Sequence, residues 1–105
     1  MVKISIFYPN KEGSTFNMDY YLNTHMPMSI QKLSPAIKGV SVEQGLIGGS
    51  LEAPPPYVVI THLLFDSVDA FLTAFQPHAE VLQGDLVNYS DVEPVIQISE
   101  VKISQ

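Results

Sequence analysis

The sequence predicts an α+β domain whose elements follow the order strand, helix, strand, strand, helix, strand. Three observations support this: a β-rich run at the N-terminus, β-rich runs in the centre and at the C-terminal end, and two stretches with apolar residues at helical spacing. Four strands and two helices in this order form the split βαβ, or ferredoxin-like, arrangement, an antiparallel sheet with both helices on one face. The 105 residues suit one such domain, residues 1–105.

The first strand and the first helix are separated by a turn. Residues Val2 to Tyr8 are β-rich, and Pro9 with Asn10 ends the run. Asn17 is a candidate N-cap of a helix that begins at Met18. Pro27 lacks an N–H group and disfavours helical geometry at the preceding residue, which predicts a break or kink near residues 25–27. The apolar residues at helical spacing are Met18, Leu22, Met26, Ile30 and Leu33.

Two central strands precede the second helix. Residues Ile37 to Leu46 and Tyr57 to Phe65 read as strands, and the second is rich in branched and aromatic side chains. A loop rich in glycine and proline joins them. Asp66 or Ser67 can cap the next helix, which Pro77 is expected to stop. Its expected buried stripe comprises Val68, Phe71, Leu72 and Phe75.

The C-terminal part begins with a shorter helical piece, roughly His78 to Asp85, and an irregular segment that reads as a turn at residues 88–91. The last strand is expected from about Glu93 to Ile103. Pro35 is expected to end the first helical region.

Both faces of the predicted sheet are apolar. In the third strand Tyr57, Val59, Leu63 and Phe65 point one way, and Val58, Ile60, His62 and Leu64 point the other. A sheet with helices on one face usually has a polar second face. The sequence therefore predicts that a second copy covers this face, giving a homodimer of packed sheets, a dimeric α/β barrel. The alternative is an apolar face left partly exposed to water.

Composition excludes several classes of protein. With 46% apolar and 15% charged residues, the chain is not intrinsically disordered. Eleven acidic residues, five lysines and no arginine argue against a nucleic-acid partner. No apolar run is long enough for a transmembrane segment, so we expect no membrane association. The absence of cysteine excludes disulfides and thiol chemistry and makes the cytoplasm the default compartment.

His25 is the main catalytic candidate. It lies where the helix is expected to break, and Tyr21 lies four residues earlier on the same face. Histidine side chains serve as general acids and bases near neutral pH. The structural alternative is that His25 binds a carbonyl group freed by Pro27 and so holds the break together.

The other two histidines have weaker functional readings. His78 follows a proline at a helix start, where capping is the favoured role and assistance to His25 the alternative. His62 shares a sheet face with apolar residues and reads as a packed core or interface side chain. The histidines lack the spacing of a metal or haem site, and no glycine-rich motif binds nucleotides, so we expect no metal and no cofactor.

Five tyrosines in so short a chain suit a pocket for a mostly apolar small molecule, although ordinary packing explains several of them. The predicted ligand-binding residues are Tyr8, Asn10, Tyr20 and Tyr89.

Two stretches resemble a known family. The segment Asn17-Met18-Asp19-Tyr20-Tyr21-Leu22-Asn23-Thr24-His25-Met26-Pro27 is similar to the D-x-Y-Y-x-x-x-H-x-P helix of the EthD family, named from ethyl tert-butyl ether degradation. The segment from Phe75-Gln76-Pro77-His78 through Asp85 and Asn88-Tyr89-Ser90-Asp91 to Val101 resembles its C-terminal half. With Tyr8-Pro9-Asn10 and Gly39-Val40, the resemblance covers nearly the whole chain.

The resemblance implies a ferredoxin-like fold, a dimeric α/β barrel and a hydrophobic small-molecule ligand that is degraded or modified. It implies acid–base or oxidoreductase chemistry without a cofactor, carried by His25 with Tyr21 and His78; monooxygenase, isomerase and dehydratase reactions all remain open. The alternative is a non-catalytic ligand carrier or an accessory protein of a P450-type monooxygenase, which would make an oxygenase a partner.

Overall fold

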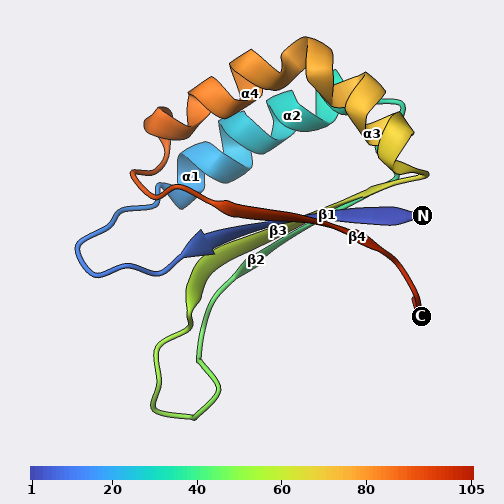
Figure 1. The fold of residues 1–105 in the computed structure, drawn as a ribbon. Helices are drawn as coiled ribbons and strands as arrows, with labels where there is room; N and C mark the ends of the chain where they lie inside the picture. The colour runs from blue at the N-terminus through green and yellow to red at the C-terminus, as the bar shows by residue number, and fades with distance from the viewer.

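Four strands form one antiparallel sheet in the computed structural model, which describes residues 1–105. The order across the sheet is β2-β3-β1-β4, and all helices lie on one face (Figure 1). This confirms the predicted ferredoxin-like arrangement, in which the first strand is central and the last strand is an edge. The strands are β1 (Val2–Pro9), β2 (Gly39–Gln44), β3 (Tyr57–Phe65) and β4 (Val95–Glu100).

The first helical region has no break at Pro27, and the irregularity expected near residues 25–27 is a π-helical turn directly before it. Helix α1 (Met18–Tyr20) passes through a π-helical turn (Tyr21–His25) into α2 (Met26–Leu33). The N–H group of Met26 donates to the carbonyl of Tyr21, five residues back, and Pro27 stands at the start of α2. The chain tolerates proline there because a residue in a first helical turn needs no N–H partner.

The predicted N-caps of both helical regions are confirmed. The side-chain oxygen of Asn17 accepts from the N–H group of Tyr20 at 3.0 Å. Ser67, one of the two expected candidates, accepts from the N–H group of Ala70 at 3.0 Å. Each bond satisfies a donor that the first helical turn leaves without a partner.

Helix α3 (Val68–Phe75) ends just before Pro77, which confirms the predicted stop. A 3-10 turn (Gln76–His78) leads into the short helix α4 (Ala79–Gly84), close to the piece expected at His78 to Asp85, and a second 3-10 turn (Asp85–Asn88) follows. Pro77 stands in the first turn of a new helical segment, where its missing N–H group costs nothing.

Only part of the predicted apolar stripe of α3 is buried. Phe71 is buried against Phe65, with ring centres 5.2 Å apart, and Phe75 stacks on Phe71. Val68 and Leu72 remain exposed. Helix α3 packs mainly against α2 and β3, which bury Phe71 but leave Val68 and Leu72 at the surface.

The two faces of the sheet differ as the strand alternation predicts, with one exception. Val59, Leu63 and Phe65 are buried beneath the helices. The strand alternation predicts Tyr57 on the same face. The pairing register, however, shifts between Tyr8 and Pro9, so that Tyr57 pairs with Pro9. The Tyr57 ring accordingly packs on Phe7 of the opposite face, with ring centres 5.1 Å apart.

The face away from the helices is mixed rather than wholly apolar. It carries Phe7, Ile60 and Leu64, together with a row of polar side chains across the strands. In that row the Ser5 hydroxyl and His62 Nδ1 lie 2.9 Å apart, and His62 Nε2 lies 3.6 Å from a carboxylate oxygen of Glu43. His62 is therefore a hydrogen-bonded histidine of this face, one of the readings its sequence position allowed. The homodimer stays a prediction.

Strand β4 is shorter than predicted and ends at Glu100. The N–H group of Val101 donates to the carbonyl of Met1 at 3.0 Å just after the strand ends. Ile103 lies outside the strand and is 84% exposed. None of the helices is both long enough and apolar enough to cross a lipid bilayer.

Candidate functional site

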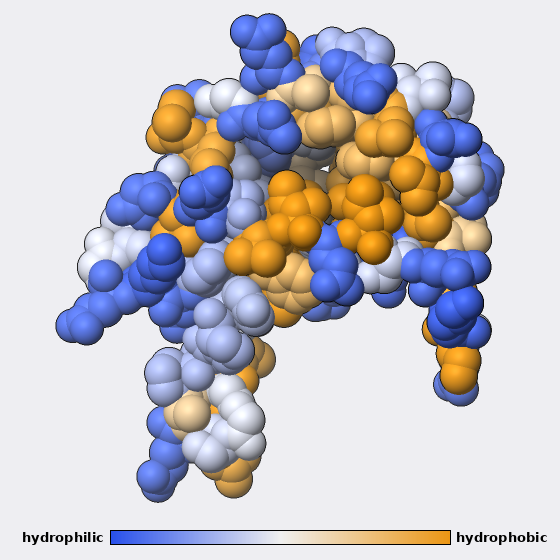
Figure 2. Space-filling model, viewed as in Figure 1, coloured by the Kyte–Doolittle hydropathy of each residue, from blue (hydrophilic) through white to orange (hydrophobic).

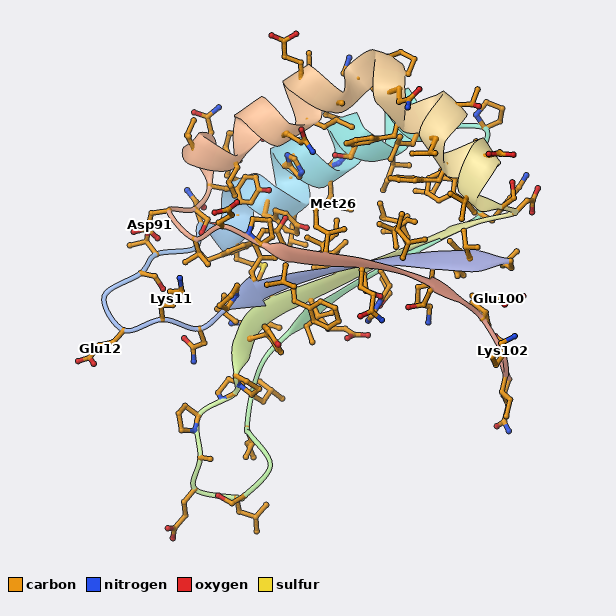
Figure 3. All side chains as sticks on the ribbon, in the orientation of Figure 1. Lys11, Glu12, Met26, Asp91, Glu100 and Lys102 are labelled. Carbon is orange, nitrogen blue, oxygen red and sulfur yellow. The ribbon has the colours of Figure 1, made fainter.

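A cavity of about 520 Å³ lies between the sheet and the helices. Figure 2 shows hydrophobic atoms gathered around the hollow between these two layers. Met26 points from α2 toward the sheet (Figure 3) and forms part of the wall. The volume is within the range of small-molecule sites, about 300–1,000 Å³. Other apolar lining residues are Ile4, Ile6, Leu33, Leu63, Phe71, Phe75, Leu82, Leu86 and Ile96.

A histidine–aspartate pair lies at this cavity. His25 comes from the π-helical turn and Asp85 begins the last 3-10 turn, so two segments 60 residues apart bring the pair together. His25 Nδ1 and Asp85 Oδ2 are 2.8 Å apart. The other carboxylate oxygen of Asp85 accepts from the Tyr20 hydroxyl at 2.7 Å and from the Asn88 amide at 2.9 Å. These two donors fix the carboxylate in place.

The contact with Asp85 determines which ring nitrogen of His25 carries the proton. A carboxylate accepts hydrogen bonds, so Nδ1 carries the proton and Nε2 is left as the acceptor nitrogen of the neutral ring. Nε2 makes no hydrogen bond within the protein, and no fully buried side-chain nitrogen or oxygen lacks a partner, so Nε2 is not fully buried. His25 is one of the residues that form the cavity wall.

Tyrosine rings hold His25 on two sides. The Tyr21 ring stacks on the imidazole with an interplanar angle of 15° and centres 5.3 Å apart, and the Tyr89 ring centre lies 4.7 Å away. The hydroxyls of Tyr8 and Tyr89 share a hydrogen bond of 2.9 Å, and those of Tyr21 and Thr61 share one of 2.6 Å. The site is a rigid aromatic cluster with its hydroxyls paired.

The environment sets the charges of these groups. Burial raises the pKa of Tyr8, Tyr21 and Tyr89, so all three remain neutral phenols. For Asp85, burial alone would raise the pKa, but hydrogen bonds from Asn88, Tyr20 and His25 outweigh it and leave the pKa below its usual value. The cavity therefore contains a fixed carboxylate, an imidazole held against it and uncharged hydroxyls.

Solved structures place this architecture in a family. A crystal structure of an EthD-like protein from Ralstonia eutropha JMP134 superposes with a TM-score of 0.94; it is 38% identical, over 99% of this chain and 94% of that one. The chain belongs to the EthD-like family.

Two more distant structures share the fold of this EthD-like chain. One is an ethyl tert-butyl ether degradation (EthD) family protein from Bacillus halodurans C-125, with a TM-score of 0.73, 20% identity and coverage of 96% of this chain and 98% of that one. The other is HapK from Hahella chejuensis, with a TM-score of 0.57, 16% identity and coverage of 100% and 97%. No protein-family model and no curated protein matches this sequence.

The structure of the EthD-like chain brings together four of the seven predicted site residues. Tyr8, Tyr21, His25 and Tyr89 all line the cavity. Tyr20 is outside the lining but reaches the site through its bond to Asp85. The structural alternative for His25 is wrong in its stated form, because the helix is unbroken and the ring binds a carboxylate rather than a freed carbonyl.

The remaining two predicted residues lie elsewhere. Asn10 is exposed, and its amide donates to the carbonyl of Pro55 at 2.9 Å, which ties the β1 end to the β2–β3 loop. His78 lies beside a shallow surface depression with Pro35, away from His25, and its side chain makes no capping hydrogen bond. Neither contacts the cavity, because the chain turns away from it at both positions.

Sequence reasoning missed Asp85, Thr61 and Ser29 as site residues. Asp85 lies within the second stretch that resembles the EthD family, but its role needs a partner 60 residues away. Thr61 could have been found from the sequence, because it is a polar residue on the buried face of an apolar strand. Ser29 donates to the His25 carbonyl at 2.9 Å and supports the helix behind the ring.

Proposed function

We propose that this EthD-like protein binds an apolar small organic molecule in its cavity and moves a proton to or from it through His25. The single observation that carries the proposal is the 2.8 Å pair of His25 Nδ1 and Asp85 Oδ2 at the wall of a mostly apolar cavity of about 520 Å³, with Nε2 free of protein partners. A base must be within reach of its substrate's proton and must have a partner for the charge it gains. Asp85 supplies that partner.

The surroundings of His25 support the same role. The stacked Tyr21 ring and the contact with Tyr89 fix the plane of the imidazole, so its position is preorganised before a ligand arrives. π-helical turns occur often at functional sites, and this one carries both Tyr21 and His25. The reaction we propose needs no cofactor, because a proton transfer requires only an acid–base group.

The family suggests the kind of process in which this protein takes part. One structural neighbour is named for ethyl tert-butyl ether degradation, and we propose that this protein likewise acts in degradation or modification of an organic compound. Isomerisation, dehydration and oxidation without a cofactor each begin with a proton removed from the substrate, so all are compatible with His25 as base.

A second candidate function is that of a carrier or an accessory protein for an oxygenase. The observation that favours it is the pairing of the cavity hydroxyls with one another, Tyr8 with Tyr89 and Tyr21 with Thr61. Because these hydroxyls bond to one another, the cavity surface can bind an apolar molecule without reacting with it.

The two candidates separate in one experiment. Protein purified without added ligand is extracted, and the bound molecule is identified by mass spectrometry and returned to wild type, His25→Asn and His78→Asn. Asn keeps a donor near the Nδ1 position for Asp85 and removes Nε2. Conversion by wild type and by the His78 control, with binding alone by His25→Asn, supports catalysis. Binding by all three proteins with no conversion supports the carrier.

A further inference from the structure

The cavity contains no cationic side chain. The five lysines, Lys3, Lys11, Lys32, Lys38 and Lys102, are all outside its wall, and the chain has no arginine. Figure 3 shows Lys11 and Lys102 at the periphery, away from the space between helices and sheet. The charged groups near the cavity are carboxylates, Asp85 behind His25 and Glu93 at the exposed rim. With a net charge of −6, the protein opposes entry of an anion.

The hydrogen-bonding groups of the cavity also restrict which ligands can bind. The Tyr8, Tyr21 and Tyr89 phenols keep their protons because burial raises the pKa of each. Their hydroxyls are already engaged with one another or with Thr61. Among the buried side chains of the wall, His25 carries an acceptor, Nε2, that has no partner within the protein; Gln83 and Glu93, which also line the cavity, are exposed to solvent. A ligand that binds here without leaving Nε2 unsatisfied must offer it a hydrogen-bond donor.

Aromatic side chains form much of the wall. Tyr8, Tyr21, Phe71, Phe75 and Tyr89 all line the cavity. Aromatic rings pair in offset-stacked or edge-to-face arrangements that gain beyond the area they bury, so such a wall favours an aromatic ligand.

We propose, as an extension of the function above on which it rests, that the ligands are uncharged aromatic molecules bearing a phenol or enol hydroxyl that donates to His25 Nε2. The absence of lysine and arginine from the wall disfavours carboxylates and phosphates, the acceptor Nε2 favours a donor, and the aromatic wall favours aromatic rings. No metal-binding cluster of three His, Asp or Glu side chains forms in the structure, and the proposal requires none.

The chemical step balances without a co-reactant. The ligand O–H bond breaks, its electron pair stays on the oxygen, and the proton forms an N–H bond at His25 Nε2. The imidazolium produced lies 2.8 Å from the Asp85 carboxylate, which stabilises its charge. Phenols lose a proton near pH 10 in water, far more readily than aliphatic alcohols, so this transfer is within the range of an imidazole.

Three probes of matched size test the proposal by titration calorimetry: 2-naphthol, 2-methoxynaphthalene and 2-naphthoate. They differ in one substituent, a donor hydroxyl, an ether without a donor and an anion. We expect wild type to bind naphthol about tenfold more tightly than the ether, the usual gain from one hydrogen bond to a buried acceptor, and to bind naphthoate more weakly than the ether. Bound naphthol should show the red-shifted absorption of a strongly hydrogen-bonded or ionised naphthol.

Two histidine variants test whether the preference for naphthol over the ether depends on His25 Nε2. His25→Asn should bind the ether as wild type does and should lose the tenfold preference for naphthol, whereas His78→Asn should match wild type with all three probes. Equal affinity of wild type for naphthol and the ether, or preferred binding of naphthoate, overturns the ligand class and leaves the proposed function standing. If none of the three binds, including the ether, the apolar binding site itself is wrong and both proposals fall.

Discussion

Asp85 gives His25 its chemical character. Its carboxylate is held by Tyr20 and Asn88 through one oxygen and meets the imidazole through the other, so the ring has a fixed orientation and one free nitrogen. Asp85 therefore acts as a positioning residue for His25. The arrangement also links the site to stability, because the same hydrogen bonds join the first helical region to the last 3-10 turn.

Removing the His25 ring should destabilise the protein through Asp85. His25→Ala leaves a poorly exposed carboxylate without one of its donors, and we expect the free energy of unfolding to fall by about 1–3 kcal/mol. His25→Asn should lose less, since its amide can still donate. Urea unfolding monitored by circular dichroism compares the two. Equal losses for both variants would show that the hydrogen bond to Asp85 contributes little.

The lowered pKa of Asp85 predicts an acid dependence of stability. A carboxyl group whose pKa is lower in the folded state stabilises the fold above its unfolded pKa, about 3.9, and that contribution disappears as pH falls through the folded pKa. The stability difference between wild type and Asp85→Asn should therefore be constant near neutral pH and shrink below about pH 4. Urea unfolding at several pH values measures it, with Glu12→Gln on an exposed turn as the control.

The hydroxyl pair of Tyr21 and Thr61 should show non-additive energetics. Both residues are fully buried, with hydroxyl oxygens 2.6 Å apart. Tyr21→Phe or Thr61→Val alone orphans the other hydroxyl and should cost about 1–3 kcal/mol. The double variant leaves neither group orphaned and should cost less than the sum of the two. Additive losses in this double-mutant cycle would mean that the two hydroxyls do not interact.

The π-helical turn is the element that builds the site. It absorbs Pro27 without breaking the helix and stacks the Tyr21 ring on His25. The sheet contributes Tyr8 and Thr61 from its two central strands, and the turn after α4 contributes Asp85 and Tyr89. The central strands thus hold Tyr8 and Thr61, whereas the irregular turns supply Tyr21, His25, Asp85 and Tyr89.

The loop between β2 and β3 projects away from the helices (Figure 1) and depends on Gly45. A Cβ atom at Gly45 would overlap the carbonyl of Tyr57 and the ring of Pro55, whereas one at Gly49 would meet nothing within 4 Å. We expect Gly45→Ala to lower the free energy of unfolding by about 1–3 kcal/mol through overpacking. Gly49→Ala, in the same loop, should change it little. Thermal melts of the two variants make the comparison, and similar melting temperatures would contradict it.

At the scale of the whole molecule, the apolar surface exceeds what the helices cover. On edge strand β4, Val95 is 55% exposed, Ile96 53% and Ile98 42%, and these residues lie on both sides of the strand. The far face of the sheet adds Phe7, Ile60 and Leu64. Exposed apolar side chains gathered on one region of a protein often mark interaction sites. We propose that a second copy covers it in a homodimer of packed sheets.

Light scattering behind a sizing column tests the homodimer. At micromolar concentration we expect a mass twice the 11.6 kDa of the chain. Ile60→Lys, on the far face of the sheet, should shift the mass toward that of one chain, because a buried lysine without a partner opposes association. Lys32→Glu, on the helical side, is the matched control and should leave the dimer intact. A wild-type mass of 11.6 kDa would contradict the proposal.

The sequence by itself determined the order of the elements, the two N-caps and the buried face of β3, because each depends on residues that are neighbours along the chain. It also identified His25 and Tyr21, four residues apart on one helix. Long-range packing, in contrast, settled that Pro27 stands in the first turn of α2 without breaking the helical region, that β4 ends at Glu100, and that His78 and Asn10 lie outside the cavity. The His25–Asp85 pair belongs to this second group, because its 2.8 Å contact joins residues 60 positions apart and no local pattern encodes such a distance.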